Sequence, residues 1–304
     1  MLKYAAKRIG VGLITLLALI VVTFLLVRLM PGNPFDVANL TPANQEEMMA
    51  HYGLDRPILE QLGKYIWNLL QGDFGISYKK SGVTVSELIL QEAPATMRLG
   101  GIAFLLALVV GTAIGIWMAA TGREFVRGGI LTFTTLGISV PNYVLALILM
   151  LVFGVQLKWF PVLGLATPLH YVLPVITLAV YPIAQISRLV KTSYAEAMQQ
   201  DYVVMARAKG ISGGRIILLH VLKSAMIPVI TTAGPMIAFL LTGSFVVETI
   251  FTIPGIGSFL VDSVNGRDYP AIQSTVLVLA ASFVLVNTLV DIIYGLVDPR
   301  VKYN

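Results

Sequence analysis

Six long apolar blocks constrain the fold of this chain more than any other feature of its sequence. Each is long enough to cross the hydrocarbon core of a bilayer, which takes about 20 residues in a helix. Inside a bilayer every backbone polar group needs an internal partner, and a helix supplies one within a single segment. The sequence therefore predicts an all-α membrane protein with six transmembrane helices. The blocks cover residues 9–29, 99–120, 130–156, 171–190, 225–250 and 274–297.

The composition excludes a soluble domain. Only 12% of the 304 residues are charged and 57% are hydrophobic, whereas soluble proteins carry about 25% charged residues to cover their surface. The chain has no cysteine, so it holds neither a disulfide framework nor a thiolate metal site. Its first apolar block is too long for the core of a signal peptide and has no small-residue cleavage site after it, so we interpret it as a retained helix.

The distribution of Lys and Arg predicts the orientation in the membrane. Six spans put both termini on one side, and 13 basic residues fall on that side. The two short loops on the other side hold one each, Lys158 and Arg267. Because basic residues are enriched in short cytoplasmic loops, both termini are predicted to be cytoplasmic. The net charge of +5 follows this membrane rule and forms no continuous basic face, so no nucleic-acid partner is predicted.

The first two predicted spans divide the chain into three parts. Residues 1–30 hold the cytoplasmic N-terminus and the first helix, and residues 99–304 hold a five-helix core. Between them, residues 31–98 carry five basic and eight acidic residues, a net charge of −3. A stretch this long forms secondary structure of its own. Here it contains two capped amphipathic segments, one ending at Gly53 and one starting near Pro57. We expect a small helical extracytoplasmic insertion packed on the membrane face, which also offers a docking surface for an external partner.

Two acidic residues lie within predicted spans. Glu248 is near the outer end of the fifth span, and Asp291 is in the inner part of the sixth. Charges inside a membrane are costly and usually face the protein interior. A coupled secondary transporter would more typically place such groups near the bilayer midplane. Both residues are therefore predicted to be structural, through an ion pair or a helix-end hydrogen bond, and not proton relays.

The chain carries no recognisable catalytic motif. The nucleophile elbow, the His-Glu-x-x-His zinc motif and the phosphate-binding loop are all absent from the sequence. Its three histidines, His51, His170 and His220, are predicted on different sides of the membrane and cannot form one site. We therefore expect a transport protein that is not an enzyme, holds no metal and does not hydrolyse ATP by itself.

A basic segment interrupts the apolar chain at residues 191–224, referred to below as the candidate coupling segment. Residues 193–209 are good helix formers, and Gly210 stands where a glycine ends a helix. Ser212 is placed to cap a second helix, which ends at Pro228. One interpretation is an ordinary basic inner loop lying on lipid headgroups. The other is a two-helix bracket that another protein contacts, because the small residues of the turn permit close approach.

The residues of this segment and several others resemble one family, the permeases of binding-protein-dependent ABC importers. The family signature is an alanine, three residues, a glycine and later a hydrophobic-Pro pair, matched here by Ala206, Gly210 and Ile227-Pro228. The resemblance covers essentially the whole chain and is closest to the first permease subunit of oligopeptide and dipeptide importers. Further matching motifs are PGNP at 31–34, GDFGIS at 72–77, GISVP at 137–141, WFP at 159–161, ETIF at 248–251, PGIG at 254–257, RDY at 267–269 and DPR at 298–300.

The resemblance implies a type I importer permease fold and a role for the basic segment. In such importers this segment docks in a groove of a separate ATPase subunit and transmits ATP-driven closure to the membrane helices. The resemblance implies that the residues in contact with the ATPase subunit are Ala206, Arg207, Lys209, Gly210, Ile211, Ser212, Gly213 and Arg215.

The implied assembly contains a second, similar permease subunit, two ATPase subunits inside and a substrate-binding protein outside. It lies in the cell (inner) membrane of a bacterium or archaeon. This chain would bind no cofactor, and its ATPase partners would use ATP. Peptides are the expected substrate, with nickel or glutathione as alternatives within the family. A secondary transporter without ATPase partners is the alternative from another class.

Overall fold

The computed structural model describes residues 2–31, 34, 46, 49–50, 53–80 and 82–297. Its regular elements are helices, apart from one isolated bridge between Ile76 and Thr84. Five helical segments are long and apolar enough to cross a membrane. The main helices are α1 (Leu2–Leu29), α3 (Ile58–Leu70), α4 (Val85–Ala120), α5 (Glu124–Ser139), α6 (Asn142–Leu149), α7 (Val172–Met198), α8 (Asp201–Ala208), α9 (Gly213–Ile216), α10 (Leu222–Leu241), α11 (Phe245–Ile250), α12 (Ile256–Asn265) and α13 (Tyr269–Val297).

The third apolar block is not the single straight span that its length predicts. It forms α5 and α6, which meet at an angle of 104°, and α6 continues as a π-helix over Met150–Gln156. The bend lies at Pro141, which disfavours the helical conformation of the residue before it. Val140 accordingly adopts an extended ψ of 122°. The six predicted spans are present if this bent pair is one span.

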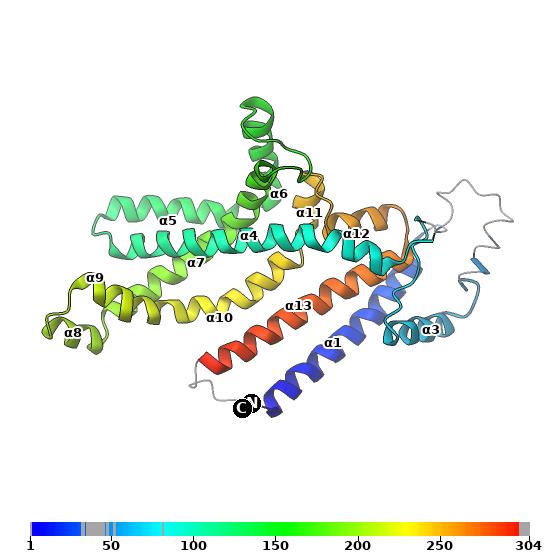
Figure 1. Ribbon diagram of the computed structural model, residues 1–304, viewed down its shortest axis with the longest axis horizontal. Helices are drawn as coiled ribbons and strands as arrows, with labels where there is room; N and C mark the ends of the chain where they lie inside the picture. Colours follow the sequence, from blue (N-terminus) through cyan, green and yellow to red (C-terminus); the bar gives the residue numbers. More distant parts are fainter. Residues whose placement is uncertain are drawn as a thin grey trace.

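Small residues allow the central helices to pack closely. Helices α4 and α7 lie side by side through the middle of the molecule (Figure 1). A Cβ at Gly111 would lie 3.0 Å from the Ile183 carbonyl oxygen, and one at Gly115 would lie 2.7 Å from that of Ser187. Such close backbone approach is typical of helix packing in membranes. Helix α10 packs on α4, α7 and α13, and α1 packs on α13.

The insertion is fixed to the bundle by its last part. The predicted helix near Pro57 is confirmed as α3, and the helix predicted before it begins outside the described residues. Ser77 donates a hydrogen bond to the Asp268 carboxylate, which also accepts one from the Tyr78 amide (3.1 Å). The Ser274 hydroxyl donates to the Phe74 carbonyl at 2.9 Å. These bonds hold the chain before α4 against the start of α13.

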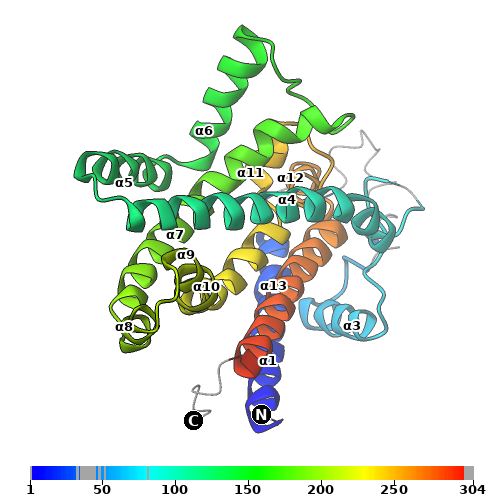
Figure 2. The ribbon, with the colours of Figure 1, turned by 60° about the vertical axis from the view of Figure 1, so that its left-hand side comes forward.

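The molecule has two ends that differ in their elements. Helices α8 and α9 lie at one end, and α3 and α12 lie at the other (Figure 1). The start of α1 and the end of α13 lie near each other in both views (Figures 1 and 2). Helix α6 projects away from the other helices in both views. The two ends are called the α8–α9 end and the α3–α12 end below.

Candidate coupling segment and polar cavity

The turn of the candidate coupling segment is closed by a glycine in a left-handed conformation. Gly210 has φ of +73° and follows α8 as the sequence predicts. Its amide donates to the Arg207 carbonyl at 2.9 Å, and the Ile211 amide donates to the Ala206 carbonyl at 3.2 Å. This pair of bonds is the Schellman motif, which satisfies the last carbonyls of a helix. The left-handed position is accessible to glycine without steric cost.

The alanine of the turn faces the interior of this chain. Ala206 is 7% exposed and packs in a cluster of buried residues from the end of α7, from α8 and from the helix that begins at α9. Its small size therefore serves the packing of α8 within this chain. Sequence reasoning placed Ala206 at a contact with another protein, and the geometry places its side chain behind that surface. The cluster comprises Tyr194, Ala197, Val203, Ala206, Ile216, Val221 and Ala225.

The outward surface of the segment combines basic and apolar side chains. Arg207, Lys209 and Arg215 are exposed around the turn. Beside them, Val204 is 62% exposed and Met205 is 58% exposed. Sequence reasoning missed these two apolar residues. The signal for them is their position on α8, where Val203 and Ala206 face inward and the intervening residues must face outward. This surface would be complementary to a groove of another protein that has both apolar and acidic groups.

The second helix of the segment differs from the prediction in two ways. Ser212 occupies the N-cap position of α9, but its side chain makes no capping hydrogen bond. The helix does not end at Pro228. It runs from α9 through a π-helix at Ile217–Val221 into α10, and Pro228 lies inside α10. The turn at Gly210 is therefore joined directly to a membrane-crossing helix, because no break intervenes. Insertions of this π type often occur at functional sites.

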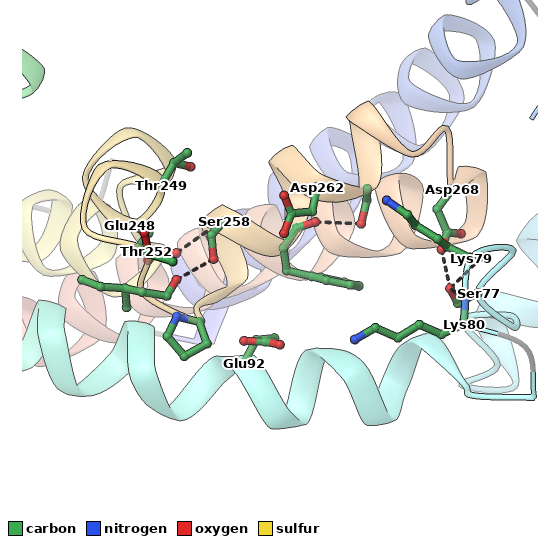
Figure 3. A pocket seen from close by; sticks show the side chains of 14 residues that line it. Ser77, Lys79, Lys80, Glu92, Glu248, Thr249, Thr252, Ser258, Asp262 and Asp268 are labelled. Atoms are coloured by element: carbon green, nitrogen blue, oxygen red, sulfur yellow. Dashed lines mark hydrogen bonds between the residues drawn. The ribbon is translucent and has the colours of Figure 1, made fainter. Parts of the chain in front are cut away.

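A polar cavity of about 750 Å³ lies at the α3–α12 end (Figure 3). It is bounded by the chain before α4, by α4 itself and by the stretch from α11 to the start of α13. Both signs of charge line it, with two lysines from the insertion and carboxylates from α4 and α12. Its charged lining residues are Lys79, Lys80, Glu92, Glu248, Asp262 and Asp268. A cavity of this size and polarity can hold a small polar solute or water.

Glu248 is fully buried at the base of this cavity. The Thr96 hydroxyl of α4 donates to its Oε1 at 3.0 Å, and the Ser258 amide of α12 donates to its Oε2 at 3.0 Å. A Cβ at Gly243 or Gly255 would lie 2.6 Å or 2.5 Å from this carboxylate. The carboxylate thus joins α11 to α4 through a side-chain hydrogen bond and to the first turn of α12 through a helix-end hydrogen bond. No ion pair to it occurs within the described part of the chain.

Replacing Glu248 separates a structural role from proton transfer. In Glu248→Gln the amide can bond both Thr96 and Ser258 once the Thr96 hydroxyl rotates, so we expect a folded protein with retained uptake. Glu248→Leu leaves buried donors unpaired, at roughly 1–3 kcal/mol each, and should lower the thermal unfolding midpoint. Thr96→Val should lower it in the same direction. Thermal unfolding and uptake by each purified variant test this. Loss of uptake in a fully folded Glu248→Gln would support a proton relay instead.

The other predicted intramembrane acid cannot be placed in the same detail. Asp291 lies on α13, and its side chain lies outside the described residues, so its structural role stays a prediction. Among the described residues no group of three or more His, Asp or Glu side chains is arranged to hold a metal ion.

Comparison with known proteins assigns the family. Residues 111–303 match the family described as binding-protein-dependent transport system inner membrane component. Residues 1–100 match the N-terminal region of the same kind of component. The chain belongs to this family. It is therefore a membrane component of a transport system, as the motifs around Gly210 and in the loops predict.

Several relatives match over their full length. The dipeptide transport system permease protein DppB of Bacillus subtilis is 40% identical over 303 residues, covering 99% of this chain and 98% of that protein. The glutathione transport system permease protein GsiC of Pectobacterium atrosepticum is 39% identical over 307 residues, with complete coverage of both chains. The oligopeptide transport system permease protein OppB of Haemophilus influenzae is 36% identical over 306 residues, also with complete coverage of both.

Solved structures show the same fold. The MetNI methionine ABC transporter in an inward-facing conformation contains a chain that aligns with a TM-score of 0.59 and 16% identity. The alignment covers 70% of this chain and 97% of that one. The predicted importer permease fold is therefore confirmed, because α-helices of this permease superpose on a chain of an ABC transporter.

Proposed function

We propose that this permease is one of two membrane subunits of an ATP-driven importer for peptides. The main support for this proposal is the family match, together with full-length relatives that are named for dipeptide and oligopeptide transport. A binding protein outside would deliver the peptide, and two ATPase subunits inside would hydrolyse ATP. This chain itself binds no cofactor in this scheme. Glutathione stays a candidate substrate because one full-length relative is named for it, and glutathione is itself a peptide.

The candidate coupling segment is the contact for the ATPase subunit in this proposal. Its turn exposes Arg207, Lys209 and Arg215 around Gly210. Met205 adds an exposed apolar side chain. Ile211, Ser212 and Gly213 continue the same turn. A displacement of this turn is transmitted to the membrane helices through two connections. One is the junction of α8 with α7, and the other is the uninterrupted helix from α9 to α10.

The remaining surfaces have roles that follow from this arrangement. The α8–α9 end faces the cytoplasm, and the insertion with residues 31–98 faces the outside. The polar cavity beside Glu248 then opens where a delivered substrate arrives. Helix α6 and its π-helix carry exposed apolar residues, among them Ile148 (49%) and Leu151 (54%). Because they project from the bundle (Figure 2), they are suited to contact the second permease subunit or lipid.

Cysteine labelling tests the orientation. Gln71→Cys lies just after α3, and Ser212→Cys lies in the turn of the candidate coupling segment; both positions are exposed. In intact cells an impermeant thiol reagent should label Gln71→Cys and leave Ser212→Cys unlabelled. The wild-type chain is a clean background because it has no cysteine. Labelling of Ser212→Cys alone would reverse the proposed topology.

Isolation of the complex tests the proposed partners. A tagged copy of this chain, solubilised in mild detergent, should co-purify with a second permease and with proteins that carry a phosphate-binding loop. The preparation should hydrolyse ATP although this chain lacks such a loop. A homogeneous preparation of this chain alone that still transports its substrate would favour the secondary transporter.

A further inference from the structure

A second cavity, of about 480 Å³, lies between α1, α3 and the start of α13. Arg28 from α1, Tyr65 and Gln61 from α3, and Gln273 from α13 line it. Several polar atoms of these lining residues are buried without a hydrogen-bond partner among the described residues. They are Arg28 Nε and Nη1, Tyr65 OH, Gln61 Oε1 and Gln273 Nε2. A buried polar group left unpaired destabilises the fold, so such a concentration points to a ligand.

The unpaired atoms are mainly hydrogen-bond donors. Arg28 offers two guanidinium N–H groups, and Gln273, which is 4% exposed, offers its amide nitrogen. Burial raises the pKa of the Tyr65 phenol to about 12, so this hydroxyl keeps its proton. The Ser274 hydroxyl lies near that of Tyr65 and donates its own hydrogen to the Phe74 carbonyl at 2.9 Å, so towards Tyr65 it can act only as an acceptor. The donors therefore match a ligand that accepts several hydrogen bonds.

The charges of the cavity favour an anion. Among its lining acids, Glu60 is paired with Arg56 at 2.8 Å, and Asp73 accepts the Gly75 amide at 2.8 Å. These partners leave Arg28 as a half-buried cation without a carboxylate partner in the described chain. Its guanidinium lies 5.0 Å from the Phe24 ring centroid and 5.3 Å from that of Tyr269. The two rings fix its plane, and a fixed guanidinium binds phosphate oxygens in bidentate fashion.

The surroundings place this cavity at the level of lipid headgroups. On α1, Leu26 is 59% exposed and Leu29 is 77% exposed, which is a surface for acyl chains. On α3, Leu59 (82%) and Trp67 (64%) are exposed. Tryptophan is enriched where membrane meets water, and an amphipathic helix with such residues lies in that interface. The cavity therefore adjoins an apolar surface on one side and water on the other.

We propose that this cavity binds a phosphate oxyanion and that the oxyanion is the headgroup phosphate of a membrane phospholipid. Arg28 receives two phosphate oxygens, while Tyr65 and Gln273 donate to the same group. The lipid joins the insertion to the bundle, because α3 and α13 contribute donors to one ligand. On the proposed orientation this lipid belongs to the outer leaflet. The inference does not depend on which substrate the permease carries.

Native mass spectrometry of the detergent-purified complex tests the proposal. The wild-type complex should retain phospholipid, and Arg28→Gln should weaken retention about tenfold or more, since a hydrogen bond to a charged group contributes about 1.5–3 kcal/mol. Tyr65→Phe keeps the stacking on Phe24, whose ring centroid is 6.0 Å away, and should still lower retention. Lys158→Gln is the matched control. It removes a positive charge outside this cavity and should retain lipid like the wild type.

Two additions to the delipidated complex distinguish the sources of phosphate. Phosphatidylglycerol should raise the thermal unfolding midpoint of the wild type but not of Arg28→Gln, and inorganic phosphate should have little effect. An equal rise with inorganic phosphate alone would overturn the lipid assignment. Equal lipid retention by the wild type, Arg28→Gln and Tyr65→Phe would show that water fills the cavity, and would overturn the proposal entirely.

Discussion

Gly210→Val is expected to abolish transport while leaving the membrane helices inserted. Gly210 has φ of +73°, and a β-branched residue in the left-handed region costs about 1–2 kcal/mol. A Cβ at this position meets no described atom of the chain within 4 Å, so the isolated permease tolerates the added bulk. The bulk lies instead on the proposed ATPase contact. We expect weaker ATPase co-purification and loss of substrate-stimulated ATP hydrolysis, measured on the purified complex.

Gly72 supplies a matched control for this variant. It follows α3 in the same Schellman arrangement, with φ of +78° and nothing within 4 Å of its Cβ position. Gly72→Val should therefore carry the same backbone strain without affecting the ATPase. Gly210→Asn relieves the strain, because asparagine tolerates this conformation, and should retain more activity than valine. Arg215→Gln should do little, because an exposed ion pair contributes about 0–1 kcal/mol. Normal ATPase binding and uptake in Gly210→Val would contradict the assignment of this turn as the ATPase contact.

Gly100→Val is expected to prevent correct packing of the helical core. A Cβ at Gly100 would lie 2.1 Å from the Leu240 carbonyl oxygen and 2.7 Å from its carbonyl carbon. Because these are backbone atoms of α10, a rotamer change cannot relieve the clash. Overpacking costs about 1–3 kcal/mol and occasionally more, and a backbone clash belongs at the upper end. We expect aggregated or misassembled protein on size-exclusion chromatography in detergent.

The neighbouring glycine is the control for this prediction. Gly101 lies on the same helix one residue later, and a Cβ there meets nothing within 4 Å. Gly101→Val changes the helix propensity by a similar amount, so it should give monodisperse protein. Equal yields of folded protein for Gly100→Val and Gly101→Val would contradict the close approach of α4 and α10.

The apolar blocks predicted the fold because membrane insertion depends on length and hydrophobicity within a single segment. Block length failed for the third span, which divides at Pro141 into helices 104° apart. It also failed for the fifth block, whose long helix α10 ends at Leu241 before the separate α11 at Phe245–Ile250. The apolar content of a block does not reveal a change of helix direction, and the proline inside the third block was the available sign of a break. The helix start at Pro57 and the helix end at Gly210 were also predicted, since both depend on local backbone preferences.

The candidate site was predictable in position but not in the direction of its side chains. Gly210 and the exposed basic residues lie at the predicted turn, yet Ala206 faces the interior. That direction depends on packing against Tyr194 and Ile216, which the spacing of small residues alone does not reveal. The polar cavity could not be predicted either. The bond from Ser77 to Asp268 joins residues 191 positions apart, and nothing in the local sequence links them.

Peptide uptake by reconstituted vesicles tests the central claim most directly. The complex of this permease with its partner subunits is placed in vesicles, with the binding protein and a labelled dipeptide on the outer-face side and ATP on the side of the candidate coupling segment. The account predicts uptake that requires ATP and the binding protein, and that persists when an ionophore removes the proton gradient. Uptake that follows the proton gradient and ignores ATP would contradict it.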